Sequence, residues 1–196
     1  MIVIVTGMPG SGKSRIVREF SEHGVPHVSM GDIVREETLK RGLELTKENV
    51  AKVSIRLRQE LGQNAVAKLT VERVKELLRK SSVVVIDGVR SLDEVGTFRS
   101  AFPEERIIIV AVHTPPHMRF SRLRARGRHD DPRSWEDFEE RDWKELRFGI
   151  GNVIAMADYM IVNDRSRAEY NREVRELVKK LLSEKAPNRA LSRGKA

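Results

Sequence analysis

The segment GMPGSGKS, residues 7–14, constrains the fold of this chain more than any other feature. It fits the spacing G-x-x-x-x-G-K-[ST] at every fixed position. An apolar, β-branched run (residues 2–5) precedes it, and a helical pattern (residues 14–23) follows it. A strand, a glycine-rich turn and a helix in this order let backbone N–H groups converge on phosphate oxygens. The sequence therefore predicts a phosphate-binding loop.

Each residue of this loop is expected to contribute to nucleotide binding. The residues are Gly7, Met8, Pro9, Gly10, Ser11, Gly12, Lys13 and Ser14. Lys13 is expected to reach the β- and γ-phosphates, and the Ser14 hydroxyl to coordinate Mg²⁺. The predicted cofactors are therefore ATP and Mg²⁺, although the loop does not separate ATP from GTP. The alternative, a glycine-rich turn with an incidental lysine, is disfavoured by the flanking strand and helix.

Apolar runs and helical patterns alternate along the rest of the chain. The expected strands are residues 2–5, 25–29, 82–86, 106–112 and 159–162. The expected helices are residues 14–23, 32–41, two within 46–79 joined at Gly62, one opening at Pro115 and Pro116, 135–148 and 167–182. This alternation predicts an α/β fold, a three-layer doubly wound parallel sheet of the P-loop NTPase type.

Composition narrows the class of protein and of ligand. The chain has no cysteine, which excludes disulfides, thiolate catalysis and cysteine metal sites. The formal net charge of +8 favours a phosphorylated or polyanionic ligand. Without an apolar run of membrane-spanning length, we expect a cytoplasmic protein that does not bind membranes. We expect one domain over residues 1–185 and a flexible basic tail over residues 186–196.

The segment SMGDIVREE, residues 29–37, follows the second expected strand. It resembles the acceptor site of nucleoside monophosphate kinases, adenylate kinase above all, in its Gly-Asp pair and the arginine three residues later. The resemblance implies that Gly31, Asp32 and Arg35 bind the acceptor, with Arg35 holding its phosphate through a guanidinium fork. From the residues alone, Asp32 also fits a helix N-cap followed by a solvated charged face.

The segment SVVVIDGVRS, residues 82–91, resembles a second part of the same kinases. There a strand ends in Asp-Gly and an arginine follows closely. The resemblance implies that Asp87 holds a water on Mg²⁺ and that Arg90 is a second ligand of the acceptor phosphate. Asp93 and Glu94 stand where adenylate kinases usually place a glutamine that reads adenine. This departure leaves the acceptor base open.

The arginine-rich segment RFSRLRARGRHDDP, residues 119–132, resembles the short lid of these kinases. The matching residues are Arg122, Arg126, Gly127, Arg128, Asp130 and Asp131. The resemblance implies that Arg122 stacks on the adenine of ATP. It also implies that Arg126, Arg128 and Arg141 stabilise the transferring phosphoryl group. The alternatives are an ion-paired helix and a nucleic-acid-binding segment; the latter is disfavoured because Phe120 is the one aromatic residue in the run.

A second resemblance changes the predicted acceptor. Residues 20–36 and 157–177 are similar to parts of dephospho-CoA kinases, which implies Asp32 as a base toward a sugar hydroxyl and residues 163–165 near the ATP base. To about residue 182, the chain is similar to archaeal P-loop proteins described as adenylate kinase-related or dephospho-CoA kinase-like. We thus expect an acceptor-binding helical excursion at about residues 31–80 and a lid at about residues 122–141.

The sequence therefore predicts an ATP-dependent small-molecule kinase. Its acceptor is expected to be phosphorylated, with a nucleoside monophosphate as the first candidate. The predicted catalytic residues are Lys13, Asp32, Arg126, Arg128 and Arg141. One alternative is a dephospho-CoA kinase-like enzyme. Another is an adenylate kinase-like ATPase switch that acts on RNA or a ribonucleoprotein, with the basic tail touching RNA. The oligomeric state stays open.

Overall fold

A five-stranded parallel sheet forms the centre of the computed structural model, which describes residues 1–128 and 131–184. Its strands are β1 (Ile2–Thr6), β2 (His27–Ser29), β3 (Val84–Asp87), β4 (Ile107–His113) and β5 (Tyr159–Val162). They lie in the order β2-β3-β1-β4-β5. The apolar runs form strands because a parallel sheet covered on both faces buries nearly every side chain. The predicted α/β P-loop fold is confirmed.

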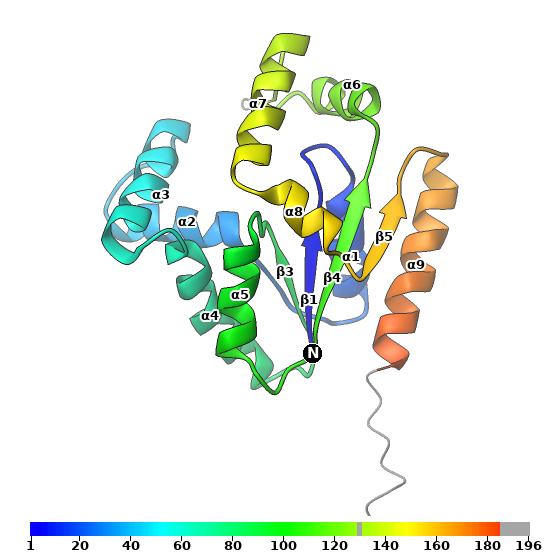
Figure 1. Cartoon of the computed structure of the whole chain (residues 1–196), viewed down its shortest axis with the longest axis horizontal. Coiled ribbons are helices and arrows are strands. Elements are labelled where there is room, and N and C mark those ends of the chain that lie inside the picture. Colours follow the sequence, from blue (N-terminus) through cyan, green and yellow to red (C-terminus); the bar gives the residue numbers. More distant parts are fainter. Residues whose placement is uncertain (129–130, 185–196) are drawn as a thin grey trace, which may run out of the picture.

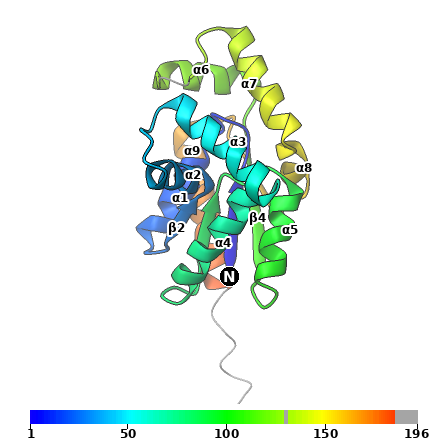
Figure 2. The same ribbon diagram turned by 90° about the vertical axis from the view of Figure 1, so that its left-hand side faces the viewer.

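Helices cover both faces of this sheet (Figures 1 and 2). They are α1 (Lys13–Glu22), α2 (Met30–Lys40), α3 (Lys47–Leu61), α4 (Ala65–Leu78), α5 (Leu92–Ala101), α6 (Pro116–Arg126), α7 (Trp135–Arg147), α8 (Ile150–Ala155) and α9 (Arg167–Ser183). Gly62 ends α3, as the sequence predicted. Helices α5 and α8 were not predicted, because α8 is only one and a half turns long and α5 carries just two fully buried apolar side chains.

The alternation of side chains along β1 divides the core into two parts. Ile2 and Ile4 pack into a cluster with apolar residues of α2 to α5 and α8. Val3 and Val5 pack on the opposite face, against α1 and α9. All four side chains are fully buried. Burial of each of these side chains contributes about 2 kcal/mol to stability. Because side chains are buried on both faces, β1 and the loop that follows it are held in a fixed position.

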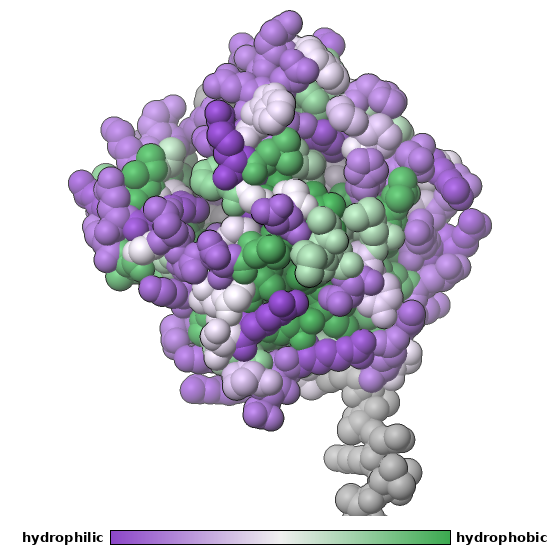
Figure 3. Space-filling model, viewed as in Figure 1, coloured by the Kyte–Doolittle hydropathy of each residue, from purple (hydrophilic) through white to green (hydrophobic). Residues whose placement is uncertain are grey.

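The candidate site lies at the carboxyl ends of the strands. Strand β1 pairs with β3 on one side and with β4 on the other, so successive connections leave it in opposite directions. Ligands of open α/β sheets bind beside such a switch point. Figure 1 shows α6 and α7 above this end of the sheet and α2 and α3 to one side. Figure 3 shows hydrophilic surface over α3, α6 and α7, whereas apolar surface gathers between α5 and α9.

The expected excursion and lid correspond to recognisable segments. Helices α2, α3 and α4 occupy the predicted excursion, and the predicted lid spans the end of α6 and the first half of α7. That the first segment binds the acceptor and the second acts as a lid stays a prediction. Residues 186–196, the predicted tail, lie outside the described residues. None of the helices in the described ranges has the length and apolar character needed to cross a bilayer.

Candidate active site

The loop between β1 and α1 is shaped by glycines that no other residue could replace without strain. Gly7 has φ of +143°, and a Cβ there would lie 2.4 Å from the Val112 carbonyl oxygen. Gly12 has φ of +107°, and a Cβ there would lie 2.5 Å from the Asn163 amide nitrogen. The loop backbone therefore sits directly against β4 and the loop after β5.

Two side chains from the β5–α9 region fix the same backbone. Asn163 Nδ2 donates a hydrogen bond to the Ser11 carbonyl at 2.8 Å, and the Tyr170 hydroxyl donates to the Gly12 carbonyl at 2.9 Å. These two bonds fix the loop at the start of α1, where the first N–H groups of a helix lack intrahelical partners and could bind an anion. Tyr170, which lies one turn inside α9, belongs to no motif that could have indicated this role.

Lys13 is the first residue of α1 and folds back over the loop. Its Nζ donates to the carbonyl oxygens of Gly7 at 2.6 Å and Met8 at 3.3 Å. Desolvation lowers the pKa of Lys13, while the nearby carboxylates of Asp87 and Glu145 act in the opposite direction. The ammonium group therefore lies against the loop carbonyls and within electrostatic reach of two acids.

Asp87 ends β3 and lies opposite Val5 in the register of the sheet. Burial raises the pKa of Asp87, and the charge of Lys13 partly offsets this effect. Its Oδ1 is buried and has no hydrogen-bond partner among the described residues. A buried carboxylate oxygen without a donor fits a metal-bound water or a metal ion better than a purely structural role.

Mg²⁺ fits this edge of the site. The hydroxyl of Ser14, which is exposed, and the Asp87 carboxylate are oxygen ligands of the kind Mg²⁺ prefers. In the described ranges, no three His, Cys, Asp or Glu residues gather into a cage of their own. Phosphate oxygens and water would complete the coordination shell, as is usual for Mg²⁺ at nucleotide sites.

The residues predicted to bind the acceptor lie at the start of α2. The Asp32 carboxylate accepts hydrogen bonds from Nε and Nη2 of Arg35, and both side chains are about half exposed. Gly31 lies beneath this pair, because a Cβ there would be 3.6 Å from Arg35 Nη1. The β3–α5 loop packs against the same turn, since a Cβ on Gly88 would lie 3.6 Å from that of Met30.

Arg90 connects this loop to α7 through a residue that the sequence did not indicate. Its Nε lies 3.2 Å from Oε2 of Glu145, which is buried. The backbone N–H of Arg90 donates to Glu94 Oε2 at 2.7 Å. Glu145 also acts on the pKa of Lys13, so it lies near the phosphate loop. A glutamate within a strongly charged helix gives no sequence signal of such a position.

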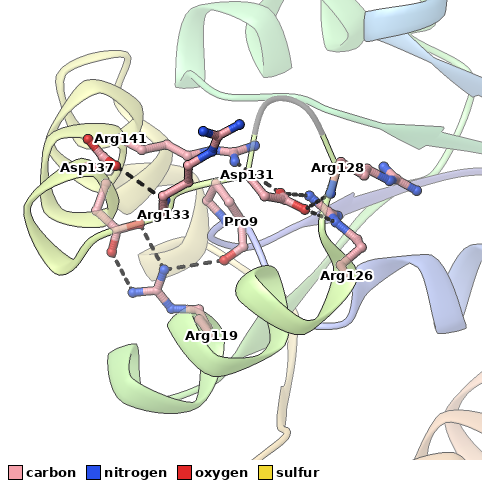
Figure 4. A network of polar contacts seen from close by, with 9 residues as sticks. Pro9, Arg119, Arg126, Arg128, Asp131, Arg133, Asp137 and Arg141 are labelled. Atoms are coloured by element: carbon pink, nitrogen blue, oxygen red, sulfur yellow. Dashed lines mark hydrogen bonds and ion pairs between the residues drawn. The ribbon is translucent and has the colours of Figure 1, made fainter.

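The lid segment predicted to stabilise the transferring phosphoryl group gathers around Asp131 (Figure 4). Arg126 donates to both Asp131 oxygens, and the Arg128 backbone N–H donates to Oδ2 at 2.9 Å. Arg141 Nη1 lies 3.4 Å from Oδ1. These interactions, the Arg126 hydrogen bonds first, lower the pKa of Asp131 to about 2. The Arg128 side chain extends away from Asp131 in Figure 4. Asp130 lies outside the described residues.

Arg119, in the same arginine-rich segment, has a structural role. Its side chain is 4% exposed and forms a two-pronged ion pair with Asp142, at 2.8 and 2.6 Å. Its Nε donates to the Thr114 carbonyl, and its guanidinium lies over the Phe138 ring. Arg119 therefore fastens α6 to α7 and to the end of β4.

Arg122 brings together the two segments expected around the ATP base. Its Nη1 donates to Thr114 Oγ1 at 3.3 Å, and Nη2 donates to the backbone and side-chain oxygens of Asn163, both at 3.2 Å. Thr114 itself donates to the Ser11 carbonyl. The base-binding role of Arg122 stays a prediction, but its guanidinium lies behind the phosphate loop and beside the β5–α9 connection.

Known proteins resemble this chain in sequence and in fold. Residues 6–139 match the family model described as AAA domain. A "UPF0200 protein" of Thermococcus onnurineus is 84% identical over 94% of this chain and 100% of its own. The structure of TT1252 from Thermus thermophilus superposes with a TM-score of 0.64 at 20% identity, covering 94% of this chain and 97% of that one.

Shikimate kinase from Acinetobacter baumannii, solved with shikimate, superposes with a TM-score of 0.56 at 16% identity and covers 94% of both chains. At these identities the two superpositions show a shared fold and no more. The sequence relatives show more, because they are similar along nearly the whole chain. The chain belongs to the UPF0200 protein family and, over residues 6–139, to the AAA domain family.

Proposed function

We propose that this protein is an ATP·Mg²⁺-dependent phosphotransferase whose acceptor is phosphorylated, with a nucleoside monophosphate as the first candidate. The observation that carries the proposal is that Lys13 and Asp87 lie at the carboxyl ends of β1 and β3, with Arg90 three residues after Asp87. Lys13 donates to the carbonyl of Gly7, directly after β1, and Asp87 lies opposite Val5 in the sheet. Lys13 and Asp87 influence each other's pKa, and Arg90 influences both. Lys13 of the phosphate loop thus lies near Arg90, a cation outside that loop which binding of ATP does not require.

Phosphoryl transfer suits such a site because it requires positioning and charge stabilisation more than covalent participation by the protein. In the proposed complex, the loop N–H groups and Lys13 bind the β- and γ-phosphates. Ser14 and Asp87 would hold Mg²⁺, which would supply positive charge beside the same phosphates. Arg122 binds the base of ATP.

Across from the donor, Arg35 and Arg90 bind the acceptor phosphate. Arg126, Arg128 and Arg141 approach the transferring group from the lid. This role requires Arg126 and Arg141 to exchange Asp131 for phosphate oxygens, which guanidinium groups bind with the same two-pronged geometry. The Asp131 carboxylate would hold the arginines together until the nucleotides are bound.

The proposal is tested by a coupled assay with ATP·Mg²⁺ against AMP, CMP, GMP, UMP, their deoxy forms and dephospho-CoA, with a control that lacks acceptor. We expect one or more acceptors to accelerate ADP formation. Lys13→Met should lower transfer by about a hundredfold or more, because it removes charge stabilisation at the phosphates. The melting temperature of this variant should not fall, because a methionine can be buried without the cost of desolvating a charge.

Lys179→Met is the matched control, because Lys179 is exposed on α9. It should transfer phosphate like the unmodified protein. Full activity of Lys13→Met would refute the proposed mechanism. Slow ATP hydrolysis that no acceptor accelerates would favour the alternative of a nucleotide-driven switch, and RNA would then be the next ligand to test.

A further inference from the structure

Arg58, on α3, is a half-buried cation that the sequence did not single out. Its Nη1 donates to the carbonyl and the hydroxyl of Ser54, one turn earlier. Among the described residues, no carboxylate lies within 4 Å of its guanidinium, and no acceptor is bonded to Nε or Nη2. Desolvation lowers the pKa of Arg58, which Glu94 offsets only in part. A guanidinium that is partly desolvated without an ion pair is well prepared to bind an anion.

A carboxylate on the same helix is already in use. Glu60 binds Arg41, whose Nη1 and Nη2 lie 3.3 and 2.7 Å from its two oxygens. This pair joins α3 to the end of α2. Glu60 is thus occupied by an arginine at the end of another helix and forms no ion pair with Arg58.

Arg58 and Arg90 meet at Phe148, the residue that ends α7. The guanidinium carbons of Arg58 and Arg90 lie 5.7 and 5.8 Å from the centre of the Phe148 ring. The charge of Arg90 contributes to the lowered pKa of Arg58, so the two cations lie within electrostatic reach of each other. An aromatic ring stabilises a cation without occupying its N–H donors. Arg90 also pairs through Nε with Glu145, so its Nη groups are the donors that would bind an anion.

The position of this pair relates it to the phosphate loop. Arg90 acts on the pKa of both Lys13 and Asp87, whereas Arg58 lies farther out, on the helical excursion. Two guanidinium groups from two separate elements match a phosphate monoester, which has three oxygens and nearly two negative charges. Bringing two like charges together against a ring costs free energy that such an anion would recover.

We propose that Arg58 and Arg90 jointly bind the phosphate of the acceptor, with Phe148 holding both guanidinium groups in place. The inference rests on the proposed phosphotransferase function and adds a residue and a geometry to it. Arg58 would link the excursion to the β3–α5 loop when the acceptor is bound. It would also require the acceptor to carry its phosphate within reach of both α3 and the loop after β3.

The test compares Arg58→Ala and Arg58→Lys with Arg56→Ala, a matched control that removes an exposed arginine from the same helix. With the best acceptor of the coupled assay, Arg58→Ala should raise the acceptor KM about 10- to 100-fold, the range for a lost charge-assisted hydrogen bond. The KM for ATP should not change. The acceptor KM of Arg58→Lys should lie between those of the unmodified protein and Arg58→Ala, because lysine keeps the charge but not the guanidinium fork. Arg56→Ala should match the unmodified protein in both constants.

A second measurement separates this inference from the proposed function. The melting temperature of each variant is followed with AMP, CMP, GMP and UMP in the presence of ADP. A rise with one nucleotide that Arg58→Ala alone abolishes supports the site even if no transfer is detected, in which case only the proposed function fails. If transfer occurs and Arg58→Ala keeps the acceptor KM of Arg56→Ala, the inference is overturned. The inference is also overturned if no transfer is detected and no nucleotide raises the melting temperature.

Discussion

The arginines of the lid and those beside the acceptor residues differ in what they are bonded to. On the lid side, the buried Arg119 forms a two-pronged pair with Asp142, and Arg126 and Arg141 converge on the buried Asp131. On the acceptor side, Arg35 forms a half-exposed pair, and Arg58 faces an aromatic ring. The carboxylates that bind the lid arginines are 15% and 3% exposed, whereas the Asp32–Arg35 pair on the acceptor side is about half exposed.

This contrast shows that arginine-rich sequence alone does not separate structural from ligand-binding residues. An arginine whose fork is filled by a buried carboxylate contributes to the fold, because removing the acid would strand a desolvated charge. An arginine in a loose or exposed pair contributes little to stability and can change partners at low cost. Ion pairs on the lid side should therefore contribute more to the free energy of unfolding than the pair on the acceptor side.

The largest effect is expected from Asp142→Ala on the lid side. The Arg119 guanidinium would remain buried without its partner, so the free energy of unfolding should fall by about 3–5 kcal/mol. Urea denaturation monitored by tryptophan fluorescence measures this loss. Glu140→Ala, which removes an exposed acid from the same helix, should cost less than about 0.5 kcal/mol. Equal losses in the two variants would remove the distinction between the two groups of arginines.

A smaller and pH-dependent effect is expected from Asp131→Asn. The folded-state pKa of Asp131, about 2, lies below its ordinary value of 3.8. Its charge therefore stabilises the fold fully above about pH 4, and this contribution is lost as the pH falls toward 2. We expect a loss of about 1–2 kcal/mol near pH 7, because solvent screens part of the interaction.

The stability difference between Asp131→Asn and the unmodified protein should narrow as urea denaturation is repeated from about pH 6 to about pH 3. Glu139→Gln, at an exposed position on α7, serves as the control and should show no such narrowing. A difference that stayed constant over this range would mean that the Asp131 charge does not hold the lid arginines.

The smallest effect on stability is expected on the acceptor side, from Asp32→Asn. The Asp32–Arg35 pair is about half exposed, so its loss should cost less than about 0.5 kcal/mol. With a phosphorylated acceptor, kcat/KM should fall less than about tenfold, because the nucleophile is already an anion and needs no base. A loss of about 10²–10⁴-fold would instead identify Asp32 as a base and favour a hydroxyl acceptor.

Features that depend on neighbouring residues could be predicted from the sequence, whereas features that depend on contacts between distant segments could not. The phosphate loop, β1 and the joint at Gly62 were predicted because each depends on residues adjacent in the chain. Helix α8 was missed because six residues are too few to show a period. Glu145 and Arg58 were missed because neither belongs to a motif, and each acquires its position only from the packing of α7 or α3 against the β3–α5 loop.

The sequence by itself determined the α/β fold and the phosphate loop. Strand burial and glycine spacing are local properties, and a parallel sheet brings the carboxyl ends of its strands to one edge. Only the tertiary structure decided which charges meet. It paired Arg119 with Asp142, gathered Arg126 and Arg141 around Asp131, and left Arg58 and Arg90 at Phe148. The physical reason is that ion pairing depends on distances of a few ångströms between segments far apart in the chain, which no local pattern records.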